Sequence, residues 1–168
     1  MPPYIAALLL HGLLAAVDVL LNHELLVRLP HRPGAASEEW LHSLRELVFA
    51  VLFVGLAWFA WHGAFAWIIG ALLLGEVLIS ACDVAVEGAI RELPATERVI
   101  HLFLFMNLGA IVVLLGDTLL AWQALPTALV PVEPGWWSWG LTALAVPALG
   151  WAIRDGLAAR RLAPVRAA

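Results

Sequence analysis

Five long apolar stretches dominate the chain, and its polar residues gather between these stretches and at their ends. Hydropathy predicts helices at about 4–27, 39–61, 64–92, 97–123 and 136–157. Joints that contain proline or glycine separate several of them, as at 30–34, 93–94 and 131–135. Each stretch has roughly the 20 residues that a helix needs to cross a hydrocarbon core. The pattern predicts an all-α integral membrane protein with five transmembrane helices, forming a single transmembrane domain over residues 1–168.

Composition supports the same class of protein. Of the 168 residues, 63% are apolar and 13% are charged, and the mean hydropathy is +0.93, which leaves too few polar groups to cover a fold in water. The start of the chain lacks a basic segment, and its first apolar run lacks a small-residue cleavage site, so we expect this run to be retained as a helix. Cys82 is the only cysteine, which excludes an intrachain disulfide and a thiolate-rich metal site. The net charge of −4, without a basic stripe, argues against nucleic acid as a partner.

The arginines indicate how the chain lies in the membrane. All but Arg45 fall in alternate joints and at the end of the chain: Arg28, Arg32, Arg91, Arg98, Arg154, Arg160, Arg161 and Arg166. Arg45 lies about two turns into the second predicted helix from that same side. Residues 61–64 and 123–135, the other two joints, contain no Arg or Lys. The positive-inside rule therefore places the N-terminus outside and the C-terminus in the cytoplasm, which requires an odd number of spans. We expect a bacterial inner-membrane protein, with tryptophans near the outer joints forming an interfacial belt.

Two segments resemble each other and suggest an internal duplication. Residues 18–30 and 83–94 both open with Asp-Val and end on Leu-Pro shortly after an Arg. Downstream of each, a Glu is followed four residues later by a His: Glu38 with His42, and Glu97 with His101. We infer two copies of a two-helix hairpin, at about 4–61 and 64–123, with an extra helix at about 136–157. Such hairpins would form a pseudo-symmetric four-helix bundle. Chance similarity between Leu- and Ala-rich helices is the alternative.

Polar side chains in the first four predicted helices recur at helical spacing, so each set shares a face. The sets are His11, Asp18 and Asn22; Glu39, His42 and Glu46; Glu76, Asp83 and Glu87; and Glu97 with His101. Most of these residues lie near the predicted cytoplasmic ends of their helices, so they should converge at one depth. Charges there cost about 2.5–3.5 kcal/mol each on insertion scales, so they need partners. Those partners are arginines in a structural network, metal ions, or a haem held by two of His23, His42 and His101.

A bundle that supplies Glu and Glu-x-x-His from its helices has the ligand set of carboxylate-bridged di-metal sites. Residues 39–42 have that spacing, and residues 97–101 have one residue more. In this pattern the chain resembles the ferritin-like di-iron carboxylate class, in its membrane-bound oxidase or hydroxylase form, over roughly 18–101. The resemblance implies two metal ions, iron first and manganese or zinc as alternatives. The implied ligands are His23, Glu24, Glu39, His42, Glu87, Glu97 and His101. Asp18, Arg45, Arg91 and Arg98 would orient them.

Three functions remain open from the sequence. The first is a metal-dependent enzyme, most simply a di-metal oxidoreductase that acts on a lipid-soluble substrate at the cytoplasmic interface. It would need a separate electron-donor protein, because the chain has no flavin or nicotinamide fingerprint. In a hydrolytic version, Glu46, Asp83 or Glu87 would be the general base. The second is a proton or metal-ion transporter, with a relay through His11, Asp18, Glu76, Asp83 and Asp117. The third is a haem-binding electron-carrier subunit.

Overall fold

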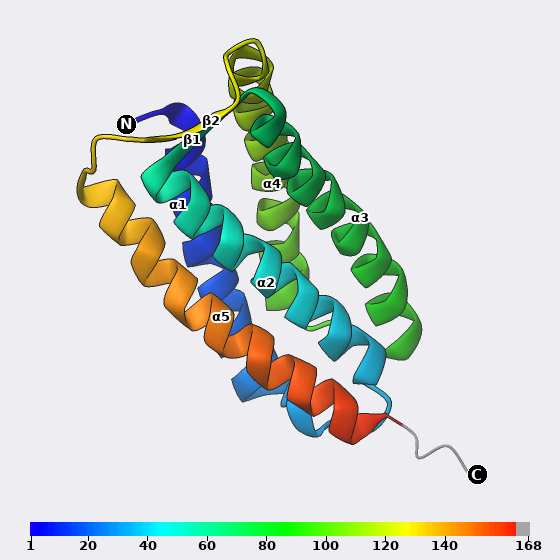
Figure 1. Ribbon diagram of the computed structural model, residues 1–168. Coiled ribbons are helices and arrows are strands. Elements are labelled where there is room, and N and C mark those ends of the chain that lie inside the picture. The colour runs from blue at the N-terminus through cyan, green and yellow to red at the C-terminus, as the bar shows by residue number, and fades with distance from the viewer. Residues whose placement is uncertain (164–168) are drawn as a thin grey trace.

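The computed structural model describes residues 1–163 and shows an all-helical protein with one small strand pair (Figure 1). Its elements are α1 (Pro3–Asp18), a π-helix (Val19–Val27), a 3₁₀ turn (Leu29–His31), α2 (Ala36–Trp58), β1 (Phe59–His62), a second 3₁₀ turn (Gly63–Phe65), α3 (Ala66–Ile90), α4 (Ala95–Gln123), β2 (Ala128–Pro131) and α5 (Trp136–Leu162). All five predicted helices exist, with ends shifted by up to five residues. Arg166 lies outside the described residues.

Four segments are long and apolar enough to cross a membrane: Pro3–His31, Ala36–Trp58, Gly63–Ile90 and Ala95–Gln123. Their burial is inverted relative to a water-soluble protein, because Glu76 is 0% exposed whereas Val113 on α4 is 70% exposed. Such a surface suits lipid. The helix α5 is 27 residues long but less apolar and is absent from this set. A membrane-spanning role for it stays a prediction.

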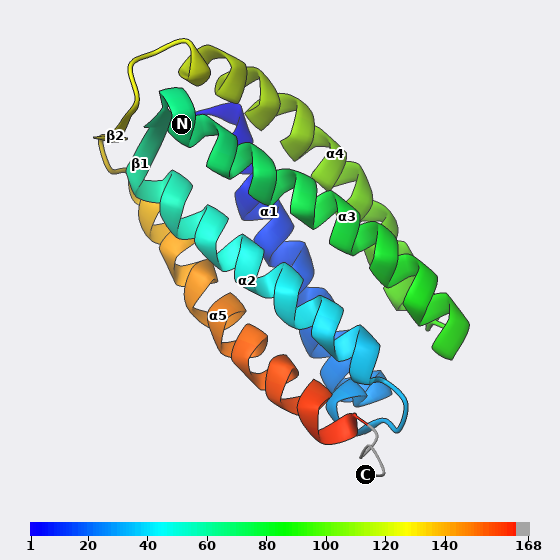
Figure 2. The same cartoon turned by 45° about the vertical axis from the view of Figure 1, so that its right-hand side comes forward.

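The helices run side by side, and α5 packs along one side of the bundle beside α2 (Figure 2). It lies along α2 over much of its length and also contacts α1. The other main neighbours are α1 with α4, α2 with α3, and α3 with α4, whereas the backbones of α1 and α2 approach each other at few points. The first two helices therefore do not pack as a close hairpin. We predicted an extra helix beside a four-helix bundle; instead α5 helps to close the bundle between α1 and α2. The duplication itself stays a prediction.

Small residues allow α5 to approach α2 closely. A Cβ added at Gly156 would lie 3.0 Å from Oγ of Ser43, and that hydroxyl donates a 2.7 Å hydrogen bond to the carbonyl oxygen of Ala152. Small side chains and interhelical hydrogen bonds are the usual means of helix association in lipid, where no hydrophobic driving force acts between apolar helices. This contact holds α5 against the half of α2 that carries its polar residues.

At the opposite end of the bundle, the two joints without arginine pair with each other. The strands β1 and β2 are antiparallel, with Phe59 opposite Pro131 and His62 opposite Ala128. Gly63 follows with φ +59°, and a Cβ there would lie 2.6 Å from backbone atoms of Thr127, so a glycine is required. The sequence predicted the end of a helix at 59–61 and a joint at 128–131, because four-residue strands carry too little periodic pattern to be recognised.

Candidate functional site

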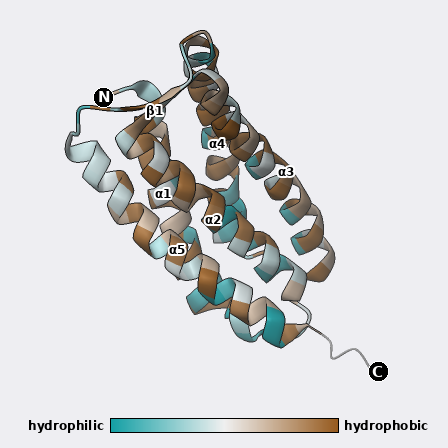
Figure 3. Ribbon diagram, viewed as in Figure 1, coloured by the Kyte–Doolittle hydropathy of each residue, from teal (hydrophilic) through white to brown (hydrophobic). Residues whose placement is uncertain are grey.

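Nearly all the buried charged groups lie toward the end of the bundle away from the strand pair (Figure 3). An apolar core with Leu8, Leu52 and Ile111 fills the other half. His11 stands between the two regions: it stacks on Phe49 with ring centroids 4.3 Å apart and accepts a 3.3 Å hydrogen bond at Nδ1 from Asn107. The predicted convergence of polar residues is therefore present in the described part of the chain.

The π-helix that continues α1 brings two polar residues inward together. A π-helix makes i→i+5 hydrogen bonds, so Asp18 and His23, five residues apart, lie near one another, with 3.6 Å between His23 Nε2 and Asp18 Oδ2. Asn22 is also buried and donates a 2.7 Å hydrogen bond to Asp18. In a regular α-helix His23 would turn away from this stripe. Nothing in the sequence signals the wider turn, and such segments occur frequently at functional sites.

A first group of possible metal ligands consists of Asp18, His23 and His101, all buried. Their ligand atoms lie within 4.8 Å of one another, and Nε2 of His101 is 3.1 Å from Oδ2 of Asp18. Two ligands at about 2.0–2.2 Å from a tetrahedral zinc ion are themselves roughly 3.3–3.6 Å apart, so these spacings suit a metal ion. Asp18 was expected to orient ligands; it belongs to the ligand group itself.

A second group consists of Glu87, Glu97 and His101, also buried, so both groups share His101. Nδ1 of His101 is 3.3 Å from Oε1 of Glu87, whose Oε2 has no hydrogen-bond partner among the described residues. Glu97 is less available as a metal ligand, because both its carboxylate oxygens accept hydrogen bonds from Arg91. The structure thus contains two buried groups that could bind metal ions, and their residue types do not identify the metal.

Arg91, directly after α3, joins two helices through carboxylates. Its side chain is fully buried and donates to Glu97 at 2.5 and 2.7 Å and to Glu38 at 2.6 Å. Burial opposes its charge, but the hydrogen bonds to Glu97 and Glu38 outweigh this and hold the pKa of Arg91 above its ordinary value. Arg91 therefore remains charged. Through Glu97, whose Oε1 is 3.2 Å from Nε2 of His23, it is also linked to the first group.

A second ion-pair network lies beside the first group. Nη1 of Arg45 donates a 2.8 Å hydrogen bond to Asp83, and its Nε donates a 3.2 Å bond to Glu76. Nε2 of His42 is 3.3 Å from the same Asp83 oxygen, and the His42 ring stacks on that of His23 at 4.5 Å. His42 thus borders the first group without belonging to it.

The two Asp–His contacts involve corresponding residues of the predicted repeats. His101 of α4 meets Asp18 of α1, and His42 of α2 meets Asp83 of α3, in each case through Nε2 and an Oδ2. A two-fold arrangement of the two hairpins would also produce this exchange between halves, but the duplication itself stays a prediction.

The remaining predicted ligands lie on the α2–α5 side. Glu24 pairs with Arg154 of α5, which also contacts Asp155. Glu39 is fully buried next to Asp155, and Glu46 is another neighbour of Asp155. Neither Glu24 nor Glu39 joins the two metal-ligand groups. Asp155 itself is 2% exposed, because α5 packs against α2 at that position.

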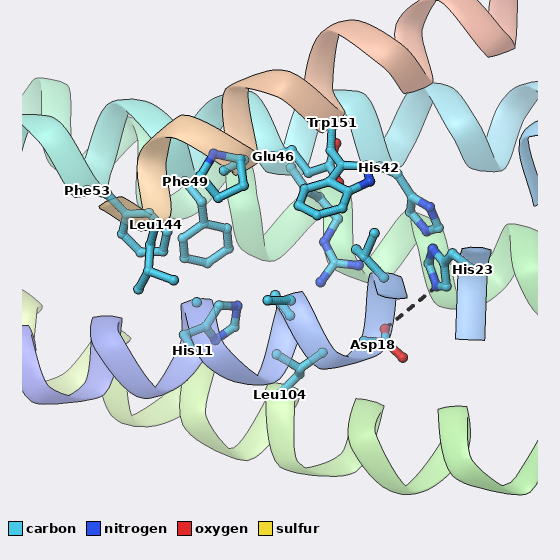
Figure 4. Close-up of a pocket in the computed structure, with 17 residues that line it drawn as sticks. His11, Asp18, His23, His42, Glu46, Phe49, Phe53, Leu104, Leu144 and Trp151 are labelled. Carbon is cyan, nitrogen blue, oxygen red and sulfur yellow. Dashed lines mark ion pairs between the residues drawn. The ribbon is translucent and has the colours of Figure 1, made fainter. Parts of the chain in front are cut away.

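A cavity begins at the first group and extends into the apolar half of the bundle (Figure 4). Its space is about 710 Å³, the open mouth included. Asp18, His23 and His42 line one end, and Phe53 and Leu144 line the other. Glu46, predicted as a catalytic base, also lines the cavity, whereas the two other candidate bases, Asp83 and Glu87, are absent from its lining.

Two further sequence predictions concern the orienting role of Arg98 and the five-residue relay. Arg98 is exposed and makes no ion pair among the described residues, so it is not positioned to orient a ligand. Of the five residues of the predicted relay, Asp117 is exposed on α4 and the other four are buried, so the five do not form one group.

The comparisons with known proteins add nothing to this picture. The chain matches no known protein family, and neither curated proteins nor solved structures show a significant similarity to it.

Proposed function

We propose that the chain is a membrane-embedded, metal-dependent enzyme that acts on a lipid-soluble substrate, most simply as an oxidoreductase. The observation that carries this proposal is the buried group of Asp18, His23 and His101 beside a cavity with an apolar far end, since Asp18 and His23 line that cavity. Two imidazoles and one carboxylate, with other positions open, form the ligand set of non-haem iron oxygenases.

The geometry assigns separate tasks to the chain's own residues. Asp18, His23 and His101 would hold the metal, which would supply Lewis-acid or redox chemistry. Asn22, hydrogen-bonded to Asp18, and Glu97, near His23, would fix their orientation. Oxidation would require dioxygen and a separate electron-donor protein. With water as co-reactant instead, Glu46 is the carboxylate that lines the cavity and would serve as base for hydrolysis.

The two-metal form of the proposal uses the second group as well. Because His101 is common to both groups, it would serve two ions at once only as an imidazolate that has lost both ring N–H protons, with Glu87 and Glu97 completing the second set. Arg91 competes for Glu97, so the second ion should bind more weakly than the first. We therefore expect iron in the first group, with manganese or zinc as alternatives, and partial occupancy of the second.

Metal analysis of the purified full-length protein tests this proposal. We expect about one equivalent or more of iron, manganese or zinc per chain, and a loss of most of it in Asp18→Ala, because that change removes a ligand. Asp117→Ala, an exposed position on another helix, is the control and should retain the metal. A folded wild-type protein without metal would refute the proposal, and a Soret band in its optical spectrum would favour a haem instead.

We also propose that the site faces the cytoplasm of a bacterial cell, since the arginine-bearing joints lie at the same end as the site. A reporter enzyme fused after Ala168 should be active only in the cytoplasm, and one inserted after Thr127 only outside, because the spans alternate in direction. As a control, the metal content of each fusion is compared with that of the untagged protein, which shows whether the fusion has disturbed the fold. Activity of the Ala168 fusion on the outer side would reverse the assigned sidedness.

A further inference from the structure

The lining of the cavity indicates which chemical class of molecule it accepts; this inference rests on the proposed function and specifies its substrate. Two hydrogen-bonding groups face the polar end. The His42 side chain is only 5% exposed, and its Nδ1 has no hydrogen-bond partner among the described residues. Arg45 uses Nε and Nη1 for Glu76 and Asp83, which leaves Nη2 without a protein partner in the described chain. Both residues line the cavity.

Apart from the proposed metal ion, the side chains at the polar end supply no spare positive charge for an anionic head group. Arg45 is the one Arg or Lys in the lining, and its charge is balanced by Glu76 and Asp83. The lining adds two further carboxyl side chains, Asp18 and Glu46. An anionic head, such as a fatty acid carboxylate, would meet repulsion from these groups. A neutral carbonyl or hydroxyl group can instead accept from Arg45 and exchange hydrogen bonds with His42 or Glu46.

Flat side chains form the next part of the cavity. Phe49 of α2 and Trp151 of α5 both line this part of the cavity, and Phe49 is itself stacked on His11 (Figure 4). Aromatic rings favour flat ligands that stack or meet them edge to face. Beyond them, Phe53, Leu104 and Leu144 offer only apolar contacts. From the polar end to the far end, the cavity wall is therefore polar, then aromatic, and then apolar.

The mouth of the cavity lies between α1 and α5. Ala15 and Ala16 on α1, and Ala148 and Trp151 on α5, are half-buried lining residues, whereas the lining residue Phe49 on α2 is buried. These two helices touch only over a limited area. Because the surrounding surface is that of a membrane-spanning bundle, a molecule would enter sideways from the lipid.

We propose that this cavity binds a quinone-type lipid: a neutral, flat ring that carries carbonyl or hydroxyl groups and an apolar chain. The ring lies between Phe49 and Trp151, and a ring oxygen accepts a hydrogen bond from Nη2 of Arg45. The chain follows the apolar wall toward Phe53. In this position the ring is adjacent to Asp18 and His23, the ligands of the first group that line the same cavity.

Titration calorimetry of the purified full-length protein with decylubiquinone tests this proposal. We expect saturable binding that is roughly tenfold or more weaker in Ala16→Phe, because an added ring occupies the cavity. Ala6→Phe places the same change on an exposed face of α1, outside the lining, and should bind as the wild type does. Should Ala16→Phe fail to fold, Trp151→Ala provides a second probe, with binding weaker by about threefold to tenfold through loss of the aromatic contact.

The outcomes separate the ligand proposal from the metal proposal. Equal binding by Ala16→Phe and Ala6→Phe would overturn the cavity as the site, and binding of dodecanoate in place of decylubiquinone would overturn the ligand class. Decylubiquinone binding is measured again after treatment with a chelator. Because Arg45, His42 and the aromatic walls require no metal, metal-free protein should still bind it. Quinone binding by a protein that never holds metal would uphold this inference and refute the enzyme proposal; metal without quinone would do the reverse.

Discussion

Replacing Arg91 by leucine should destabilise the protein by about 3–5 kcal/mol, because it removes one member of a buried charged cluster and leaves the others uncompensated. Glu38 and Glu97 are 0% exposed and both accept hydrogen bonds from this guanidinium. Without it, two carboxylates remain in a medium that cannot solvate them. The free energy of unfolding, measured by denaturant titration of protein in detergent micelles, should show the loss.

Two controls distinguish this cluster from a general effect of removing an arginine. Arg98→Leu removes an exposed arginine seven residues away and should change stability by less than about 0.5 kcal/mol. Adding Glu38→Gln and Glu97→Gln to Arg91→Leu should recover part of the lost stability, since the amides carry no charge. A wild-type-like Arg91→Leu protein would mean that the cluster contributes nothing to the fold.

Replacing His101 by alanine should remove metal from both groups at once. His101 is the one residue they share, with Nε2 facing Asp18 and Nδ1 facing Glu87. Because the change deletes a ligand instead of an orienting partner, we expect metal affinity to fall by more than the roughly 10–100-fold typical of orienting residues. Elemental analysis of purified protein should then find less than about a tenth of the wild-type metal content.

Variants of residues that belong to only one group, or to neither, show whether the metal loss in His101→Ala is specific. Glu87→Gln should empty only the second group and leave the first loaded, while His62→Ala, at the opposite end of the bundle on β1, should leave both loaded. Circular dichroism of each variant confirms that helices remain. Full metal retention in folded His101→Ala would exclude both groups as metal sites.

Much of the architecture follows from local features of the chain. The helices are evident from apolar runs, because a helix that crosses a hydrocarbon layer carries few charges. Helical spacing also indicated that Glu97 and His101 share a face, and four of the seven predicted ligands, His23, Glu87, Glu97 and His101, do belong to the two metal-ligand groups. The charges had to converge, since isolated charges in lipid are costly.

What the sequence by itself determined was therefore which helices form and which of their faces are polar. Only the tertiary structure decided which polar residues meet. Glu39 faces α5 and Asp155 instead of His101, because α5 packs between α1 and α2, and no periodic pattern specifies which neighbour a helix will have. The π-helix that brings His23 to Asp18 and the cavity beside them depend likewise on contacts between distant segments, which local spacing does not encode.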